Sequence, residues 1–244
     1  MQRGLTIIIA IFLLIFCAVI VTIYVSIGSV ISEAVQKRME VITQTPVAVG
    51  EVDYSANTGL TSIASVQINN PAGFTQEAAI QFGKVELWID PQTLNTPVIH
   101  IKAVSISNPE VAYEIKNDTD NLRKLRQQIE YSLRNNQPRA GDKLFYVENI
   151  TFEPGTLVIT SKNLTGKRST SALSKISIPA IGSNAEGVTA ERLAYEMILP
   201  LLRETTLSAL NTDLPLDDQA RNLLNGALDE TNKAVDILKG ILKQ

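Results

Sequence analysis

A long stretch without charge, close to the first residue, constrains this chain more than any other feature. Residues 4–32 contain no Asp, Glu, Lys or Arg, and the run from Leu5 to Val25 is almost wholly apolar. As a helix, this run reaches about 31 Å, close to the roughly 30 Å hydrocarbon core of a bilayer. We therefore expect a single transmembrane anchor. The residues assigned to it are Leu5, Ile9, Leu13, Leu14, Phe16, Val21 and Val25.

A cleaved signal peptide is the alternative interpretation of the same run. Ser26 and Gly28 supply small residues for a weak cleavage site, but the apolar core of a signal peptide is usually shorter, about 7–15 residues. A lipoprotein signal is disfavoured because bulky Phe16 precedes Cys17 and apolar sequence continues beyond it. The length of the run favours the uncleaved anchor.

The basic residues on the two sides of the run are nearly equal in number, so charge alone gives little preference for either orientation. Arg3 precedes it, and Lys37 and Arg38 follow it. Because very few polar residues precede the span, we expect the N-terminus in the cytoplasm and the bulk of the chain translocated.

Composition excludes several functional classes. The net charge is −3, and because Arg3 is the one charged residue before residue 33, the remainder carries −4. This balance argues against a nucleic-acid binder. One Cys and one His cannot form an intrachain disulfide or a Cys/His zinc site. No phosphate-binding loop or dinucleotide fingerprint occurs. We expect no cofactor, no metal and no catalytic residues, with an unrecognised carboxylate hydrolase as the remaining enzymatic alternative.

From residue 46 to 182, apolar residues alternate with polar ones, which is typical of half-buried antiparallel strands. Between Phe145 and Phe152 the alternation changes parity, which indicates a bulge or a strand that is apolar on both faces. Turns are expected at Asn70-Pro71-Ala72-Gly73, Asp90-Pro91, Asn108-Pro109 and Pro154-Gly155. The strands predicted from these patterns are 47–56, 60–69, 82–90, 98–105, 108–115, 143–152, 155–162 and 171–178.

Helices are predicted on either side of the first strands. The segment 33–45 forms a stalk helix that ends before Pro46. The segment 119–135 carries an apolar stripe, with capping oxygens from Asn117, Asp118 or Thr119. Most of its basic residues lie off this stripe, namely Arg123, Lys124, Arg126 and Arg134. They are compatible with a helix that covers the sheet, or with a surface that contacts anionic lipid headgroups.

The order of motifs resembles that of the AsmA-like proteins of double-membraned bacteria, in particular short, single-module members. The resemblance covers roughly residues 30–165. It consists of NPAGF at 70–74, GKVELWIDPQTL at 83–94, VIHIKAVSISNPEVAYE at 98–114 and Asn121-Leu122 at the start of the next helix.

This resemblance implies an inner-membrane-anchored periplasmic protein, whose β-sheet curls into a groove with an apolar interior. It also implies a part in phospholipid transport or outer-membrane lipid homeostasis. An ordinary core packed under helices is the alternative for each candidate residue of such a groove. The candidates are Ile68, Val85, Leu87, Ile89, Ile99 and Ile101.

Two further helices are predicted at the C-terminal end. The first begins after an N-cap at Thr189 and reaches about Leu210, with Pro200 expected to kink or split it. The second covers 217–243. Its apolar face could pack inside the molecule, bind a partner or a second copy, or lie on the membrane. The candidate partner face consists of Leu224, Leu228, Val235, Leu238 and Leu242.

The sequence thus predicts an α+β protein: an N-terminal transmembrane helix, a curved antiparallel sheet packed with helices, and two C-terminal helices. Its divisions are the anchor segment 1–32, the stalk 33–45, the β-rich domain 46–182 and the helical region 183–244. The leading functional hypothesis is a non-enzymatic protein that binds membrane lipid or assists its transport. The alternative is an accessory subunit that docks onto a larger envelope complex without lipid cargo.

Overall fold

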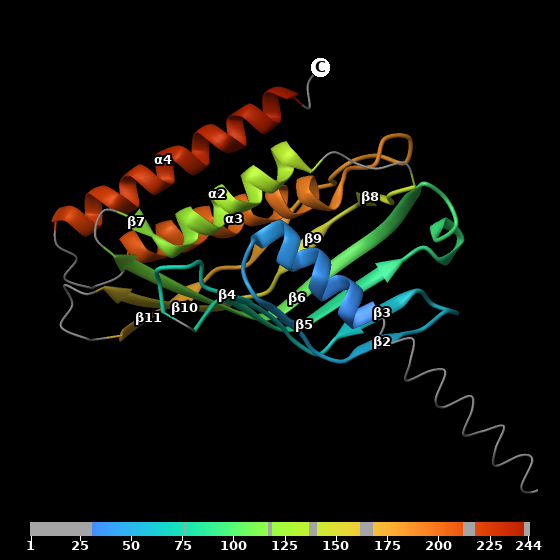
Figure 1. Cartoon of the computed structure of the whole chain (residues 1–244), viewed down its shortest axis with the longest axis horizontal. Coiled ribbons are helices and arrows are strands. Elements are labelled where there is room, and N and C mark those ends of the chain that lie inside the picture. Colours follow the sequence, from blue (N-terminus) through green and yellow to red (C-terminus); the bar gives the residue numbers. More distant parts are fainter. Residues whose placement is uncertain are drawn as a thin grey trace, which may run out of the picture.

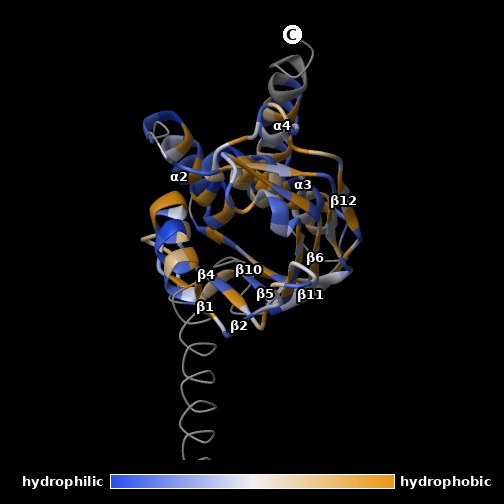
Figure 2. Cartoon of the chain, turned by 90° about the vertical axis from the view of Figure 1, so that its right-hand side faces the viewer, coloured by the Kyte–Doolittle hydropathy of each residue, from blue (hydrophilic) through white to orange (hydrophobic). Residues whose placement is uncertain are grey.

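The computed structural model describes residues 31–75, 77–116, 119–136, 141–161, 168–211 and 218–241. The anchor predicted between Leu5 and Val25 lies outside these ranges. Within them the chain forms an α+β fold, in which a mixed sheet curves around helices on its concave side (Figure 2). No helix in this part of the chain is both long and apolar enough to cross a bilayer.

The helices are residues 31–43, α2 (Asn121–Asn135), α3 (Ala190–Leu210) and α4 (Asp218–Ile241), with a 3₁₀ turn η1 at Pro91–Thr93. The strands are β1 (Val47–Val49), β2 (Val52–Tyr54), β3 (Leu60–Ile63), β4 (Val66–Asn69), β5 (Ala78–Ile89), β6 (Val98–Lys116), β7 (Thr119–Asp120), β8 (Leu144–Val147), β9 (Ile150–Phe152), β10 (Gly155–Ser161), β11 (Arg168–Leu173) and β12 (Ile176–Ile178).

The main path across the sheet is β1-β4-β5-β6-β10-β11, and most of the other strands continue its members (Figure 1). The pairing register of β1 with β4 carries on between β2 and β3. Likewise β8, β9 and β10 lie one after another along β6 in one unbroken register. The short strands are therefore segments of longer strands, each interrupted by a residue or two.

The prediction of a wholly antiparallel sheet is wrong. The strands β8, β9 and β10 all run parallel to β6. The cause is α2, which follows β6 and carries the chain back so that β8 begins beside the first residues of β6. A helical crossover of this kind is how parallel neighbours are normally connected.

The predicted turn at Asn108-Pro109 is also wrong, because β6 runs through it. Asn108 has a φ of 49°, a left-handed conformation that Asn tolerates better than most residues. The buried side of β6 also changes here: after Ile106, the next buried residue is Pro109, three positions later instead of two. On the parallel neighbour, a Cβ at Gly155 would lie 2.0 Å from the Pro109 carbonyl oxygen, so only glycine fits. A proline in a central strand is accommodated at such an irregularity.

The change of parity predicted between Phe145 and Phe152 is confirmed. Val147, Ile150 and Phe152 are all at most 2% exposed, and the interruption lies between β8 and β9. The turn at Asp90-Pro91 is confirmed too, since the Asp90 carboxylate caps η1 by accepting from the Gln92 N–H.

The helices lie close to their predicted positions. Residues 31–43 form the N-terminal helix, and α2 is capped by Asp120, whose carboxylate accepts from the Arg123 N–H. Thr119 belongs to β7 instead, while the other two predicted caps, at 117 and 118, lie outside the described residues. The predicted N-cap at Thr189 is confirmed. Pro200 is predicted to kink or split this helix; α3 runs through it as one helix from Ala190 to Leu210, so the split is wrong. Leu199 and Leu201, on either side of the proline, are both buried.

One hydrophobic core joins the sheet to the helices, so α3 and α4 belong to the same packed unit as the β-rich segment. The largest fully buried side chains come from β5, β6, β9, β10, β11, α2 and α3, together with Ile181. α4 packs chiefly on α3, on the side away from the sheet (Figure 1).

Candidate functional site

The helices cover the concave face of the sheet unevenly. Where α2 and α3 lie over it, inward residues such as Tyr113, Leu157 and Leu173 are at most 1% exposed. Where β5 ends and β6 begins, Leu87 and Ile89 pack against the same core but remain only half-buried.

Ile99 of β6 and Phe145 of β8 extend this half-buried region. They are Cα partners in the parallel β6–β8 pair, and both pack against the core without being enclosed by it. We call the set of Leu87, Ile89, Ile99 and Phe145 the apolar end. A site for an apolar ligand is lined mainly by apolar side chains.

The structure divides the six predicted groove residues into two groups. Ile68, Val85 and Ile101 are core residues, at 6%, 8% and 4% exposure. Leu87, Ile89 and Ile99 are the half-buried group. Sequence patterning missed Phe145, although its alternation with buried Val147 was a usable signal.

Two helices contribute further half-buried apolar residues next to this core. Ile31 and Met39 come from the N-terminal helix, and Leu193 and Met197 from α3. The partly buried apolar residues around the core therefore come from the helices as well as from the sheet.

An ion pair ties the same two helices together. A terminal guanidinium nitrogen of Arg38, on the N-terminal helix, lies 2.7 Å from Glu191 Oε1, in the first turn of α3. The Glu191 side chain is 1% exposed and that of Arg38 is 45% exposed. Ser32, on the same helix, donates to the carbonyl oxygens of Val49 and Gly50.

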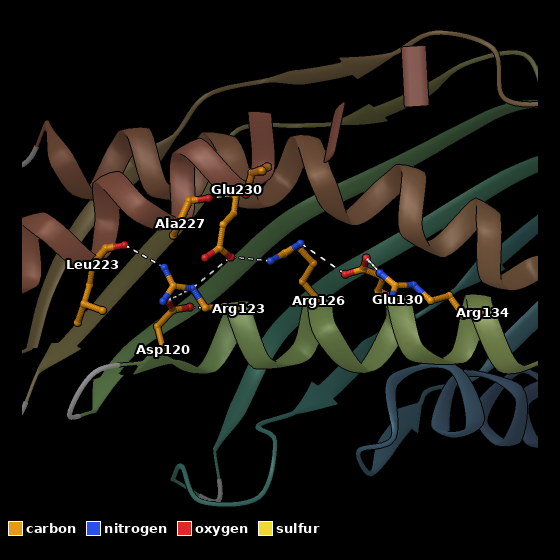
Figure 3. Close-up of polar contacts among 9 residues, drawn as sticks. Asp120, Arg123, Arg126, Glu130, Arg134, Leu223, Ala227 and Glu230 are labelled. Carbon is orange, nitrogen blue, oxygen red and sulfur yellow. Dashed lines mark hydrogen bonds and ion pairs between the residues drawn. The ribbon is translucent and has the colours of Figure 1, made fainter. Parts of the chain in front are cut away.

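A separate polar cluster lies between α2 and α4 (Figure 3). The Arg126 guanidinium donates to Glu230 Oε2 at 2.7 Å, and Arg123 Nε lies 3.5 Å from the same oxygen. Arg123 also donates to the Leu223 carbonyl oxygen at 3.3 Å. The cap residue Asp120 completes the cluster, with Oδ2 3.8 Å from Arg123 Nε.

Burial dominates the electrostatics of this cluster. It raises the pKa of Asp120, although the Arg123 N–H and guanidinium oppose the rise. It also raises the pKa of Tyr113 well above its usual value, with the neighbouring Asp120 charge acting in the same direction. Within the described ranges, no group of three or more His, Cys, Asp or Glu residues could hold a metal ion.

The basic residues of α2 are largely engaged by the protein itself. Arg123 and Arg126 contact Glu230, Arg134 pairs with Glu130, and Lys124 donates to the Ala72 carbonyl oxygen. This arrangement favours α2 as a helix that covers the sheet over α2 as a lipid-headgroup surface.

The candidate partner face of α4 turns out to border a buried seam. Leu224 is fully buried, and Leu228 and Val235 are half-buried at its edge. The Leu238 side chain and all of Leu242 lie outside what the structure describes. The other buried residues in the described part of α4 are small: Ala220, Ala227, Thr231 and Ala234.

Comparison with known proteins adds no family assignment. The chain matches no protein-family model. No curated protein shows significant similarity to it. The resemblance to AsmA-like proteins therefore stays a prediction, and the function has to be argued from the geometry.

Proposed function

We propose that this protein binds the acyl chain of a membrane lipid at the apolar end. It would do so as a non-enzymatic protein of the bacterial cell envelope, held at the inner membrane by the Leu5–Val25 run with its body in the periplasm. One observation carries the proposal: Leu87, Ile89 and Ile99, expected in a lipid groove, lie at the margin of the core where its enclosure is incomplete.

The location suits a lipid that enters from a bilayer. The apolar run ends at Val25 in the sequence, and the helix that the structure describes from residue 31 onwards packs its half-buried Ile31 against the core to which the apolar end belongs. A bound acyl chain would remove the exposed parts of these side chains from water, at about 25 cal/mol per Å² of apolar surface.

The test compares the lipid content of the full chain with that of Ile99→Asp. Both proteins are extracted from the same membranes in mild detergent, and bound phospholipid is measured by mass spectrometry. A buried, unpaired carboxylate disfavours an acyl chain by a few kcal/mol, so we expect at least about a tenfold loss of bound lipid.

The matched control is Lys102→Asp, which places the same carboxylate on the exposed side of the same strand. It should retain bound lipid at the level of the unsubstituted chain. Absence of phospholipid from the unsubstituted chain, or equal content in both variants, would refute the proposal.

A docking subunit without lipid cargo is the second candidate, favoured by an exposed apolar pair. Val41 and Tyr131 are 51% and 60% exposed, and the Ser132 hydroxyl, next to Tyr131, donates to the Val41 carbonyl oxygen. The two side chains thus lie where the N-terminal helix meets α2.

If this pair docks onto a partner, Tyr131→Ala should release copurifying envelope proteins without lowering the unfolding temperature of the chain. Leu224→Ala is the contrasting variant, because Leu224 is fully buried and its truncation should destabilise the fold by about 2–5 kcal/mol. Unchanged copurification in Tyr131→Ala would argue against docking at this pair.

A further inference from the structure

A small pocket lined by both polar and apolar side chains lies within the cluster between α2 and α4. The space open to the centre of a water molecule is about 10 Å³, which is at the lower limit for holding one water. Side chains from β6, β7, α2, α3 and α4 line it, among them Tyr113, Asp120, Arg123 and Glu230.

Three buried polar atoms at this cavity have no hydrogen bond of good geometry among the described residues: Tyr113 Oη, Asp120 Oδ2 and Arg123 Nε. The Tyr113 hydroxyl and the Asp120 carboxylate are near enough to shift each other's pKa. The Tyr113 and Asp120 residues are each 1% exposed. The separation of 3.8 Å between Arg123 Nε and Asp120 Oδ2 is that of an ion pair, too long for a hydrogen bond. Leaving such groups unsatisfied costs about 1–3 kcal/mol each.

The charges around the cavity favour a neutral occupant. Two guanidinium groups, of Arg123 and Arg126, face two carboxylates, of Asp120 and Glu230. A cation would be repelled by the first pair and an anion by the second. The small volume then excludes anything larger than one water molecule.

The donors and acceptors also match one water. Tyr113 Oη–H and Arg123 Nε–H can each donate to its oxygen, and its two protons can go to the carboxylates of Asp120 and Glu230. We propose that a single ordered water molecule binds in this cavity and joins Tyr113, Asp120 and Arg123, as an integral part of the contact between α4 and the rest of the fold.

Removing the Tyr113 hydroxyl tests the proposal, because the direction of the change in stability depends on whether the hydroxyl has a hydrogen-bond partner. If a water satisfies this hydroxyl, Tyr113→Phe should raise the unfolding equilibrium constant of the full chain about fivefold. If the hydroxyl has no partner, the same substitution removes a buried unsatisfied group and lowers that constant. Tyr54→Phe is the control, because Tyr54 is half-buried in β2, away from the cluster, and should leave the constant unchanged.

A crystal structure of the full chain with ordered solvent distinguishes the remaining explanations. We expect one density peak within about 2.7–3.2 Å of Tyr113 Oη, Asp120 Oδ2 and Arg123 Nε. A direct hydrogen bond between Tyr113 and Asp120 with no density peak in the cavity would overturn the proposal, as would a more stable Tyr113→Phe variant.

Discussion

Gly155→Ala should destabilise the protein by at least about 3 kcal/mol, because the added methyl group has no space in the centre of the sheet. Its Cβ would lie 2.0 Å from the Pro109 carbonyl oxygen and 2.6 Å from Pro109 Cγ. The obstructing carbonyl belongs to the backbone of β6 and cannot rotate away. To make room, β10 has to move off β6, which breaks their parallel pairing along Glu110–Ile115.

The free energy of unfolding can be measured by urea titration of the full chain in mild detergent. Trp88 is the one tryptophan in the sequence, and it is 36% exposed on β5, so its fluorescence reports on the sheet. A change smaller than about 1 kcal/mol would show that β6 and β10 do not approach as closely as described.

Gly226→Ala is the matched control, since it adds the same methyl group within α4. The nearest atom to its Cβ would be a terminal nitrogen of Arg123 at 3.4 Å, an ordinary contact. Alanine favours a helix interior over glycine by about 1 kcal/mol, so this variant should be as stable as the unsubstituted chain or slightly more stable.

Arg38→Ala should cost about 2 kcal/mol, because it leaves the Glu191 carboxylate buried without its cation. Breaking a fully buried ion pair costs about 3–5 kcal/mol, and the half-exposed Arg38 side chain reduces the effect here. The same urea titration measures it. The expected consequence is a weaker link between the N-terminal helix and α3.

Two further variants separate the ion pair from other effects of the substitution. The double variant Arg38→Ala with Glu191→Gln should recover part of the lost stability, because no charge is then left buried. Lys37→Ala removes a neighbouring cation whose partner Glu33 is 66% exposed, and should leave the stability of the fold essentially unchanged. Equal losses in Arg38→Ala and Lys37→Ala would contradict the role assigned to Glu191.

Local patterns predicted much of the secondary structure. Alternating residues located β5 and most of β6, and the amphipathic stripes located α2 and α4. Capping chemistry worked at Thr189, whose hydroxyl accepts from the Arg192 N–H. It failed at α2, where the cap is Asp120, immediately after the three predicted residues. Neighbouring capping residues compete, and tertiary contacts select one of them.

The candidate sites depended far more on tertiary contacts. The Asp120, Arg123 and Glu230 cluster joins side chains more than one hundred residues apart in the sequence, and no local pattern connects them. The Arg38–Glu191 pair was missed for the same reason.

The sequence by itself determined where the charge-free apolar run lies and that an α+β body follows it, because these properties depend on residues close together in the chain. Only the tertiary structure decided that β8, β9 and β10 run parallel to β6 and that β6 passes through Asn108-Pro109. It also decided that Ile68 and Ile101 belong to the core, whereas Leu87 and Ile99 remain half-buried. Strand partners and helix coverage arise from contacts between distant segments, and an apolar residue has the same local pattern whether or not a helix covers it.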